Sequence, residues 1–277
     1  MGLRIATNTQ SLAAQRNLGV NSGAQKNSLE KLASGSRINR ASDDAAGLAI
    51  SEKMRASIRT VRQDIRNAND GISMIQTAEG GMNEVSNILI RFRELSTQAA
   101  SDTLSDTERG FVDKEVQQLK QEVDRIARVT EFNGHHLLSG EGGPLEIQVG
   151  MNNNPELDRF RYDPSKTDVT LNTLGLSGIG VADKQTAQEN LGKIDEAIRG
   201  LSSNRAELGA LQNRFASSVS SLTIFDENMS SARSRIFDVD MAMETAELTK
   251  DNILTQAGVS VLGQANQNNM MALKLLG

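Results

Sequence analysis

The strongest constraint on the fold is a seven-residue repeat of large apolar residues in the C-terminal part of the chain. The repeat has no break: Ile194, Leu201, Leu208, Phe215, Leu222, Met229 and Ile236. A second apolar set falls at or next to the other core position of the heptad: Leu191, Ile198, Leu211, Val219 and Phe225. A heptad repeat sustained over this length predicts a long helix, at residues 185–237, that packs as a coiled coil.

A partner for this helix is indicated in the N-terminal half. From Met54 to Ile75 apolar residues alternate in steps of four and three, and after a slip of three residues the pattern resumes from Ala78 to Phe92. Such a slip predicts a local overwinding of the supercoil. The pattern predicts a helix over residues 43–101, with Ser42, Asp43 and Asp44 as its N-cap and acidic first turn.

A third helix is predicted at residues 105–130. Apolar residues repeat there with the same rhythm: Val112, Val116, Leu119, Val123 and Ile126. Ser105 and Glu108 have the spacing of a capping box at its start. Three apolar seams that face one another predict a helical bundle.

The middle of the chain has a different character. All three prolines lie there, at positions 144, 155 and 164, and residues 134–181 are rich in Gly, Asn and Pro. Residues 144–151 and 159–162 read as two strands joined by a turn. The predicted fold class is therefore mainly α: a long antiparallel coiled coil or helical bundle with a small β-hairpin region.

The two chain ends predict one further helix each, and we expect these helices to pair. Their apolar residues form more stripes than two helices can cover, and the second stripe is expected to contact another copy of the chain. Identical copies that associate head to tail without closing form a filament. The candidate assembly residues are Leu12, Leu18, Leu29, Leu32, Leu254, Val261, Leu262, Leu273, Leu275 and Leu276.

Composition and motifs argue against several classes of function. The chain has no cysteine, which excludes disulfides and thiolate chemistry, and its net charge of −5 argues against nucleic-acid binding. The uncharged stretch 253–273 holds too many amides for a membrane span. We find no catalytic, cofactor or metal motif. His135 and His136 are adjacent, which suits a loop better than a metal chelate.

Several long motifs resemble those of bacterial flagellins. Residues 34–55 (SGSRINRASDDAAGLAISEKMR) and 67–100 are similar to the N-terminal signature of that family. Residues 208–222, 230–250 (SSARSRIFDVDMAMETAELTK) and 253–267 are similar to the C-terminal signature. The motifs occur in the same order as in the family and cover both arms of the chain.

The resemblance implies a secreted subunit of the extracellular flagellar filament, exported through the flagellar type III apparatus, and not an enzyme. It implies an inner domain from residues 1–42 and 238–277 and a rod domain from residues 43–237, in a minimal form without large outer domains. The implied partners are further copies of the chain, an export chaperone at the C-terminus, and the hook-junction and cap proteins.

A receptor contact is also implied by the resemblance. Residues 89–99 (LIRFRELSTQA) are similar to the flagellin segment that an innate immune receptor recognises, and the matching contact positions are Arg91, Leu95 and Glu115. Arg91 and Leu95 are four residues apart and off the seam formed by Val85, Leu89 and Phe92. We therefore expect both on one exposed helix face.

Two other classes of protein remain open from the sequence. A hook–filament junction protein would share the terminal design, but it would occur in few copies. A free coiled-coil signalling protein or adhesin would not polymerise under any seeded condition. An enzyme is the weakest reading.

Overall fold

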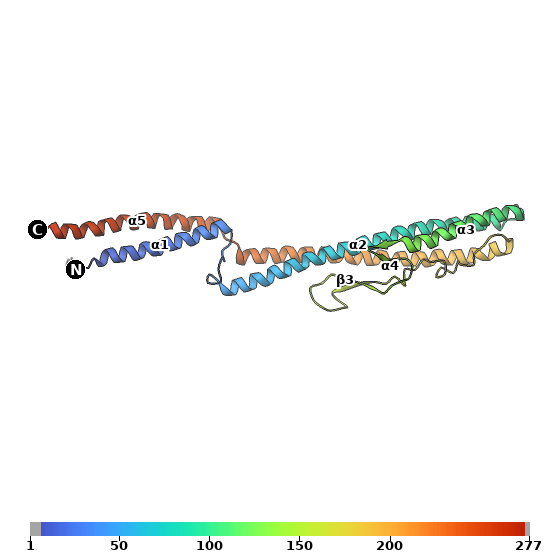
Figure 1. The fold of residues 1–277 in the computed structure, drawn as a ribbon, viewed down its shortest axis with the longest axis horizontal. Helices are drawn as coiled ribbons and strands as arrows, with labels where there is room; N and C mark the ends of the chain where they lie inside the picture. Colours follow the sequence, from blue (N-terminus) through green and yellow to red (C-terminus); the bar gives the residue numbers. More distant parts are fainter. Residues whose placement is uncertain (1–6, 275–277) are drawn as a thin grey trace. The chain divides into compact units, whose positions relative to one another are not determined.

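The fold is mainly α-helical, as the sequence predicts. The computed structural model describes the backbone of residues 7–274 and the side chains of residues 7–267. In chain order the elements are α1 Thr9–Ser34, α2 Ala45–Ala99, α3 Asp106–Val129, β1 Glu131–Phe132, β2 His135–His136, β3 Leu145–Gln148, β4 Arg159–Tyr162, α4 Lys184–Phe237 and α5 Met241–Lys274 (Figure 1). Among the described residues, no helix has the length and apolar character that a membrane span requires.

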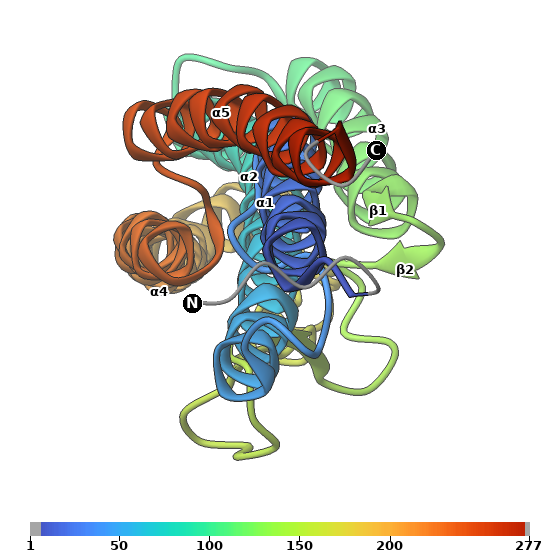
Figure 2. The same cartoon turned by 90° about the vertical axis from the view of Figure 1, so that its left-hand side faces the viewer.

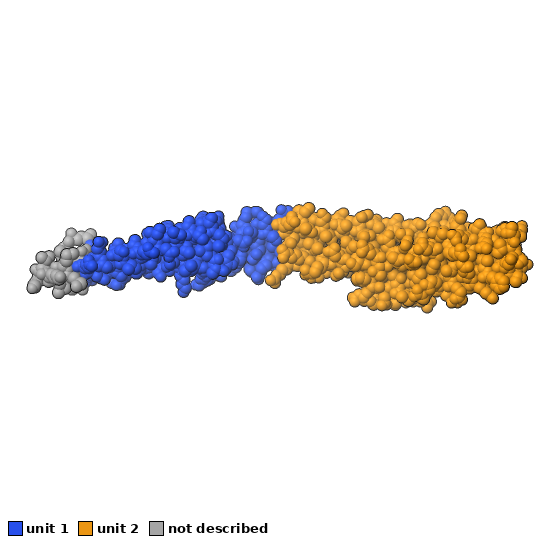
Figure 3. Space-filling view, turned by 90° about the horizontal axis from the view of Figure 1, so that it is seen from above, with its two compact units in different colours: residues 1–58, 228–277 blue, residues 59–227 orange. Residues whose placement is uncertain are grey.

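The chain forms two compact units (Figure 3). One contains residues 1–58 and 228–277, and the other contains residues 59–227. Both α2 and α4 contribute to each unit, so the units divide within these helices. The helix breaks at residues 35–44 and 238–240 both lie inside the first unit. The boundaries expected between an inner domain and a rod domain, after residues 42 and 237, therefore differ from the division into these units and stay a prediction.

In the second unit, α2 and α4 run antiparallel. Three ion pairs join them at successive positions: Arg62 with Asp226, Glu79 with Arg205, and Arg93 with Asp195. Asp102, in the turn just after α2, pairs with Lys184 at the start of α4. Residue numbers rise along α2 while they fall along α4, which fixes the antiparallel direction. The first four heptad residues of α4, Ile194, Leu201, Leu208 and Phe215, are buried in the core, whereas Leu222, Met229 and Ile236 are half-buried.

The buried stripe of α2 differs from the predicted one. From residue 64 to residue 99 it advances in regular steps of four and three, through Asp64, Ala68, Gly71, Ile75, Ala78, Met82, Val85, Leu89, Phe92, Ser96 and Ala99. The predicted slip after Ile75 is therefore wrong, because Asp64 and Gly71 occupy core positions while Ile65 and Ile72 are half-buried. The irregular step lies earlier, at Ile58, Val61 and Asp64.

Gly71 is a core residue because an aromatic ring lies over it. A Cβ at this position would be 2.8 Å from Cζ of Phe215 on α4. The Phe215 ring also packs edge-on against Phe160 of β4, with ring centroids 4.8 Å apart. The Arg214 guanidinium lies 4.6 Å from the centroid of the Phe160 ring. These contacts fasten the β3–β4 hairpin to the helices.

The turn from α2 to α3 is closed by polar side chains. The predicted capping box is confirmed, since Ser105 Oγ accepts from the Glu108 amide while Glu108 Oε2 accepts from the Ser105 amide. The buried guanidinium of Arg109 donates to the carbonyls of Ala99 and Ser101. It thereby satisfies acceptors at the end of α2 that the helix itself leaves open.

The structure contains two antiparallel strand pairs among the described residues. The larger pair was predicted, and the smaller one corrects a prediction. Strands β3 and β4 pair antiparallel from Leu145 opposite Tyr162 to Gln148 opposite Arg159, as predicted. His135 and His136 form β2, which pairs with β1, and are therefore not the loop pair that the sequence suggested. Asn133 and Gly134 make the turn with φ of 49° and 78°. Asn-Gly is the preferred pair for such a turn.

Candidate assembly surface

Helices α1 and α5 pair through a seam that is mostly polar or small. The α1 positions shielded by the pairing follow steps of three and four: Ser11, Ala14, Leu18, Asn21, Gln25, Ser28 and Leu32. The corresponding α5 positions are Glu244, Leu248, Asp251, Thr255, Gly258, Leu262 and Ala265. Only Leu18, Leu32, Leu248 and Leu262 are large and apolar, so burial in this seam provides little stabilisation.

Hydrogen bonds across the seam set its direction. Asn8 Nδ2 donates to the carbonyl of Ala265 over 2.9 Å, and Lys31 Nζ lies 3.5 Å from a carboxylate oxygen of Glu244. Early residues of α1 thus face late residues of α5, and the helices are antiparallel and side by side (Figures 1 and 2). The predicted pairing of the two terminal helices is confirmed.

The large apolar side chains of the pair mostly point away from the seam. Leu12 is 58% exposed and Val261 is 54% exposed, and Leu29 and Leu254 are exposed as well. Leu18, Leu32 and Leu262 are instead half-buried in the seam, so the ten candidates do not form one surface. The side chain of Leu273, and Leu275 and Leu276 altogether, lie outside the described residues.

Further apolar residues belong to the exposed surface. Ile253, Val20 and Val259 are exposed as well, and none of them is among the ten candidates. Val20 and Val259 each follow a glycine and precede a polar residue, so a search for repeating leucines does not select them. We use the term outer apolar face for the exposed surface of the pair that carries Leu12, Val20, Leu29, Ile253, Leu254, Val259 and Val261. These side chains surround the pair and do not form one stripe, because Val259 and Val261 point about 160° away from each other on α5.

The two connectors of this unit bind each other where the helix pair begins. The Arg37 amide donates to the Phe237 carbonyl over 2.7 Å, and the Val239 amide donates to the Gly35 carbonyl over 3.1 Å. Gly35 ends α1 with φ of 70°, a conformation that glycine adopts without strain. The contact holds the ends of α1 and α4 together, and no motif in the sequence indicated it.

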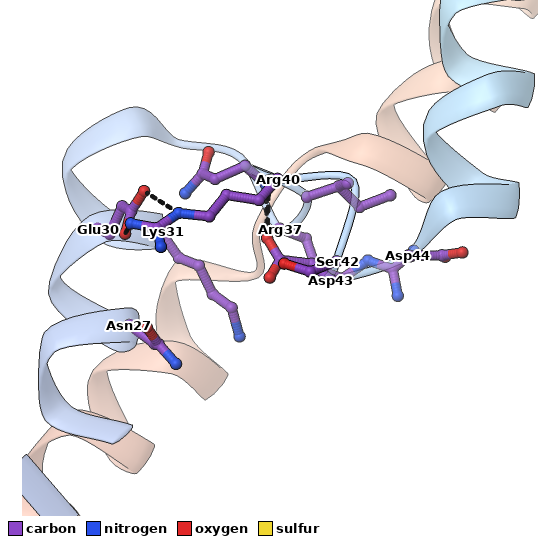
Figure 4. Close-up of a pocket in the computed structure, with 10 residues that line it drawn as sticks. Asn27, Glu30, Lys31, Arg37, Arg40, Ser42, Asp43 and Asp44 are labelled. Carbon is purple, nitrogen blue, oxygen red and sulfur yellow. Dashed lines mark hydrogen bonds and ion pairs between the residues drawn. The ribbon is translucent and has the colours of Figure 1, made fainter. Parts of the chain in front are cut away.

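A polar hollow of about 460 Å³ lies beside the connector from α1 to α2 (Figure 4). Arg40 crosses it and binds Glu30 with Nη2 2.7 Å from Oε2.

The N-cap of α2 differs from the predicted one. Asp44, not Ser42 or Asp43, caps α2, because its Oδ1 accepts from the Gly47 amide over 2.8 Å. The Asp43 carboxylate accepts from the amides of Arg40 and Asn39, and these bonds lower the pKa of Asp43. These residues shape the connector.

The candidate receptor residues lie together in the second unit, but they are not equally exposed. Nη2 of Arg91 on α2 is 2.8 Å from Oε1 of Glu115 on α3, and both side chains are exposed. Leu95 is only 2% exposed and belongs to the core, so the expectation of an exposed Leu95 is wrong. The regular heptad of α2 places its buried stripe at Phe92 and Ser96, and Leu95, next to Ser96, is buried beside that stripe.

Among the described residues, no three His, Cys, Asp or Glu side chains converge as metal ligands. Both histidines are exposed on β2. What the fold presents is an apolar face on paired terminal helices, joined to coiled-coil helices with a packed aliphatic core. These features define a coiled-coil structural protein.

Comparison with known proteins identifies the family. Residues 5–142 match the model of the bacterial flagellin N-terminal helical region, and residues 191–276 match that of the C-terminal helical region. A flagellin of Halalkalibacterium halodurans is 44% identical over 97% of this chain and 98% of its own length. The flagellin of Bacillus subtilis is 39% identical over 99% of this chain and 100% of its own.

A solved structure agrees with this result. The crystal structure of Bacillus cereus flagellin is 32% identical, covers 61% of this chain and 94% of its own, and superposes with a TM-score of 0.51. The chain belongs to the bacterial flagellin family, in a short form without a large outer domain. It is a structural protein and not an enzyme.

Proposed function

We propose that this chain is the subunit that polymerises into a bacterial flagellar filament used for swimming. The observation that supports this proposal best is the outer apolar face of the α1–α5 pair. Seven large aliphatic side chains are exposed there, while most positions in the seam between the helices are polar or small. Burying one such side chain fully contributes about 1.5–3 kcal/mol, so contact with further copies would provide what the seam lacks.

The same face gives a physical reason for the other partners. An exposed apolar surface promotes unspecific association, so a chaperone that covers the C-terminal helix before export is expected. Secretion through the flagellar type III apparatus, addition under a cap protein and attachment to hook-junction proteins follow from the family resemblance. The inner domain of residues 1–42 and 238–277 would then line the filament core, and residues 43–237 would form the rod around it.

Polymerisation tests the proposal directly. We expect deletion of residues 1–40 or 238–277 to abolish sedimentable filaments while the second unit keeps its thermal transition. A finer test is Val261→Gln, which removes one member of the outer apolar face without opening a cavity. It should raise the critical concentration for seeded growth, whereas the exposed neighbour Gln264→Ala should not. Unchanged filament yield from either deletion would refute the proposal.

The same assay separates the competing readings. A hook–filament junction protein would form short or closed assemblies and occur in few copies per flagellum, whereas a filament subunit grows without a fixed end. A coiled-coil adhesin would stay monomeric with any seed. Electron microscopy of seeded protein therefore distinguishes the three.

A second function is supported by the pairing of Arg91 with Glu115. Two charged side chains from different helices form one exposed surface, and surfaces that contain arginine are common centres of binding energy. We infer that the monomer presents these residues to the innate immune flagellin receptor. A reporter assay with Arg91→Ala and Glu115→Ala tests this inference, and undiminished signalling from both variants would refute it.

A further inference from the structure

A charged residue occupies a core position in α2 of the second unit. Asp64 is 3% exposed and lies in the buried stripe one step before Ala68. Its Oδ2 is buried and has no hydrogen-bond partner in the part of the chain that the structure describes. An isolated carboxylate is costly to bury unless it is neutralised or paired. A positive charge next to the Asp64 carboxylate would therefore stabilise its ionised form.

The end of the β3–β4 hairpin lies against this part of α2. Asn67, one turn beyond Asp64, donates from Nδ2 to the carbonyl of Gln148 over 3.1 Å. The next two amides, of Val149 and Gly150, both donate to the carbonyl of Asp158. Asp158 therefore lies beside the strand end that contacts α2, one helical turn from Asp64.

Asp158 adds a second largely buried carboxylate. It is 8% exposed, and its Oδ2 accepts from the Asn154 amide over 2.9 Å. Its Oδ1 lies close to Gly150, where a Cβ would come within 2.1 Å of that oxygen. Gly150 is thus needed for the carboxylate to reach its position. The loop around it also holds main-chain and asparagine oxygens at the same end of the hairpin. Several of them already accept one hydrogen bond, as the Gly150 and Asn152 carbonyls do from Gln148 Nε2, and each such oxygen has a second lone pair.

The surrounding cations are engaged elsewhere. Arg159, next to Asp158, binds Glu146, Gln148 and Asn153, while on α2 Arg62 binds Asp226 and Arg66 binds Gln63. Burial raises the pKa of Asp64, and the charge of Asp158 raises it further. Arg66 contacts only a neutral amide, but among the described residues no ion pair involves Asp64 or Asp158. Two acidic groups thus share one buried region without a side-chain counter-charge.

We propose that Asp64 and Asp158 bind a divalent cation of calcium's size between α2 and the loop of residues 149–158. Calcium accepts six to eight oxygen ligands in flexible geometry, which suits two carboxylates supplemented by loop carbonyls, amide oxygens and water. Magnesium requires a stricter octahedron and dehydrates reluctantly, so it should bind more weakly. The bound ion would fasten the hairpin to α2. The proposal goes beyond filament formation and does not depend on it.

Thermal unfolding of the full-length monomer tests the proposal. In calcium chloride at about a hundredfold excess over its dissociation constant, the transition should rise by about 5 °C relative to EDTA. Asp64→Asn and Asp158→Asn should each abolish this rise. Asp70→Asn, an exposed aspartate on the same helix, should keep it. A rise that persists in Asp64→Asn, or no rise in the parent protein, would overturn the proposal.

A binding readout removes the dependence on stability. Terbium ions occupy oxygen-ligand sites for calcium, and direct excitation of the ion reports its binding without a nearby aromatic ring. Tyr162, the single tyrosine, lies four residues beyond Asp158 at the other end of β4. We expect terbium luminescence that calcium displaces in the parent and in Asp70→Asn, and none in Asp64→Asn. Equal luminescence in all three proteins would place the ion elsewhere and overturn the assignment.

Discussion

Nη2 of Arg91 lies 2.8 Å from Oε1 of Glu115, and Nη1 of the same guanidinium lies 2.9 Å from Oε2 of Glu94. One side chain thus joins α2 to α3 and also binds one turn along its own helix. Both of its acidic partners are exposed, so water and salt screen the interaction. The network shapes the surface more than it stabilises the fold.

Arg91→Ala and Glu115→Ala should therefore leave the thermal unfolding midpoint nearly unchanged. If the inferred receptor contact is correct, both variants should signal more weakly as monomers in a reporter assay. Calorimetry and the reporter assay on the same preparations separate the two effects. A large loss of stability would mean that the ion pair has a structural role that its exposure does not suggest.

Leu95→Ala should behave differently, because Leu95 is buried. Truncating a buried leucine to alanine costs about 2–5 kcal/mol of unfolding free energy through lost burial and the cavity left behind. Ile90→Ala is the control, since Ile90 is on the same helix but 49% exposed, and it should cost much less. Urea denaturation measures both. Equal losses in the two variants would contradict the placement of Leu95 in the core.

Gly71→Ala should destabilise the second unit. The added Cβ would lie 2.8 Å from the Phe215 ring, and the ring would have to shift from Phe160. Overpacking of this kind typically costs about 1–3 kcal/mol. Gly80→Ala, on the same helix with open space around its Cα, should instead stabilise by about 0.5–1 kcal/mol. Opposite signs in chemical denaturation would confirm the contact, and two stabilising changes would contradict it.

Asp64→Asn should show a pH-dependent gain in stability. The pKa of Asp64 is raised in the folded protein, so folding favours its protonated form and the ionised form destabilises the fold. In EDTA the variant should be more stable than the parent at neutral pH. Its advantage should shrink as the pH falls through the raised pKa. Unfolding midpoints measured across this range check the sign; a constant or growing difference towards low pH would contradict it.

The apolar periodicity of each long segment and the capping box of Ser105 and Glu108 were enough to predict the helices, and the strand and turn residues of the middle region were enough to predict the larger hairpin. Apolar periodicity fails where the core uses residues that are not apolar. Asp64 and Gly71 occupy the buried stripe of α2 because a hairpin loop and the Phe215 ring pack there, and these contacts come from distant parts of the sequence. The Asn133–Gly134 turn, by contrast, carried a local signal that could have been read.

The candidate surface was only partly predictable for a related reason. A leucine on a terminal helix can face either its partner helix or another molecule, and the heptad rule assigns it to the partner. In α1 the seam takes serine, asparagine and glutamine, so Leu12 and Leu29 are left outside. Which stripe pairs within the chain depends on the direction and register of α5, and a single sequence does not specify these.

The polar seam between α1 and α5 has a kinetic consequence. Asp251 Oδ2 and Thr255 Oγ1 are buried in it without hydrogen-bond partners among the described residues, so the closed pair gives up solvation that opening restores. A helix pair with so polar a seam should separate and re-form readily in a single molecule. If further copies cover the outer apolar face, each added subunit would stabilise the closed α1–α5 pair of its neighbour. The terminal helices would then become fixed only in subunits that already lie behind the growing tip.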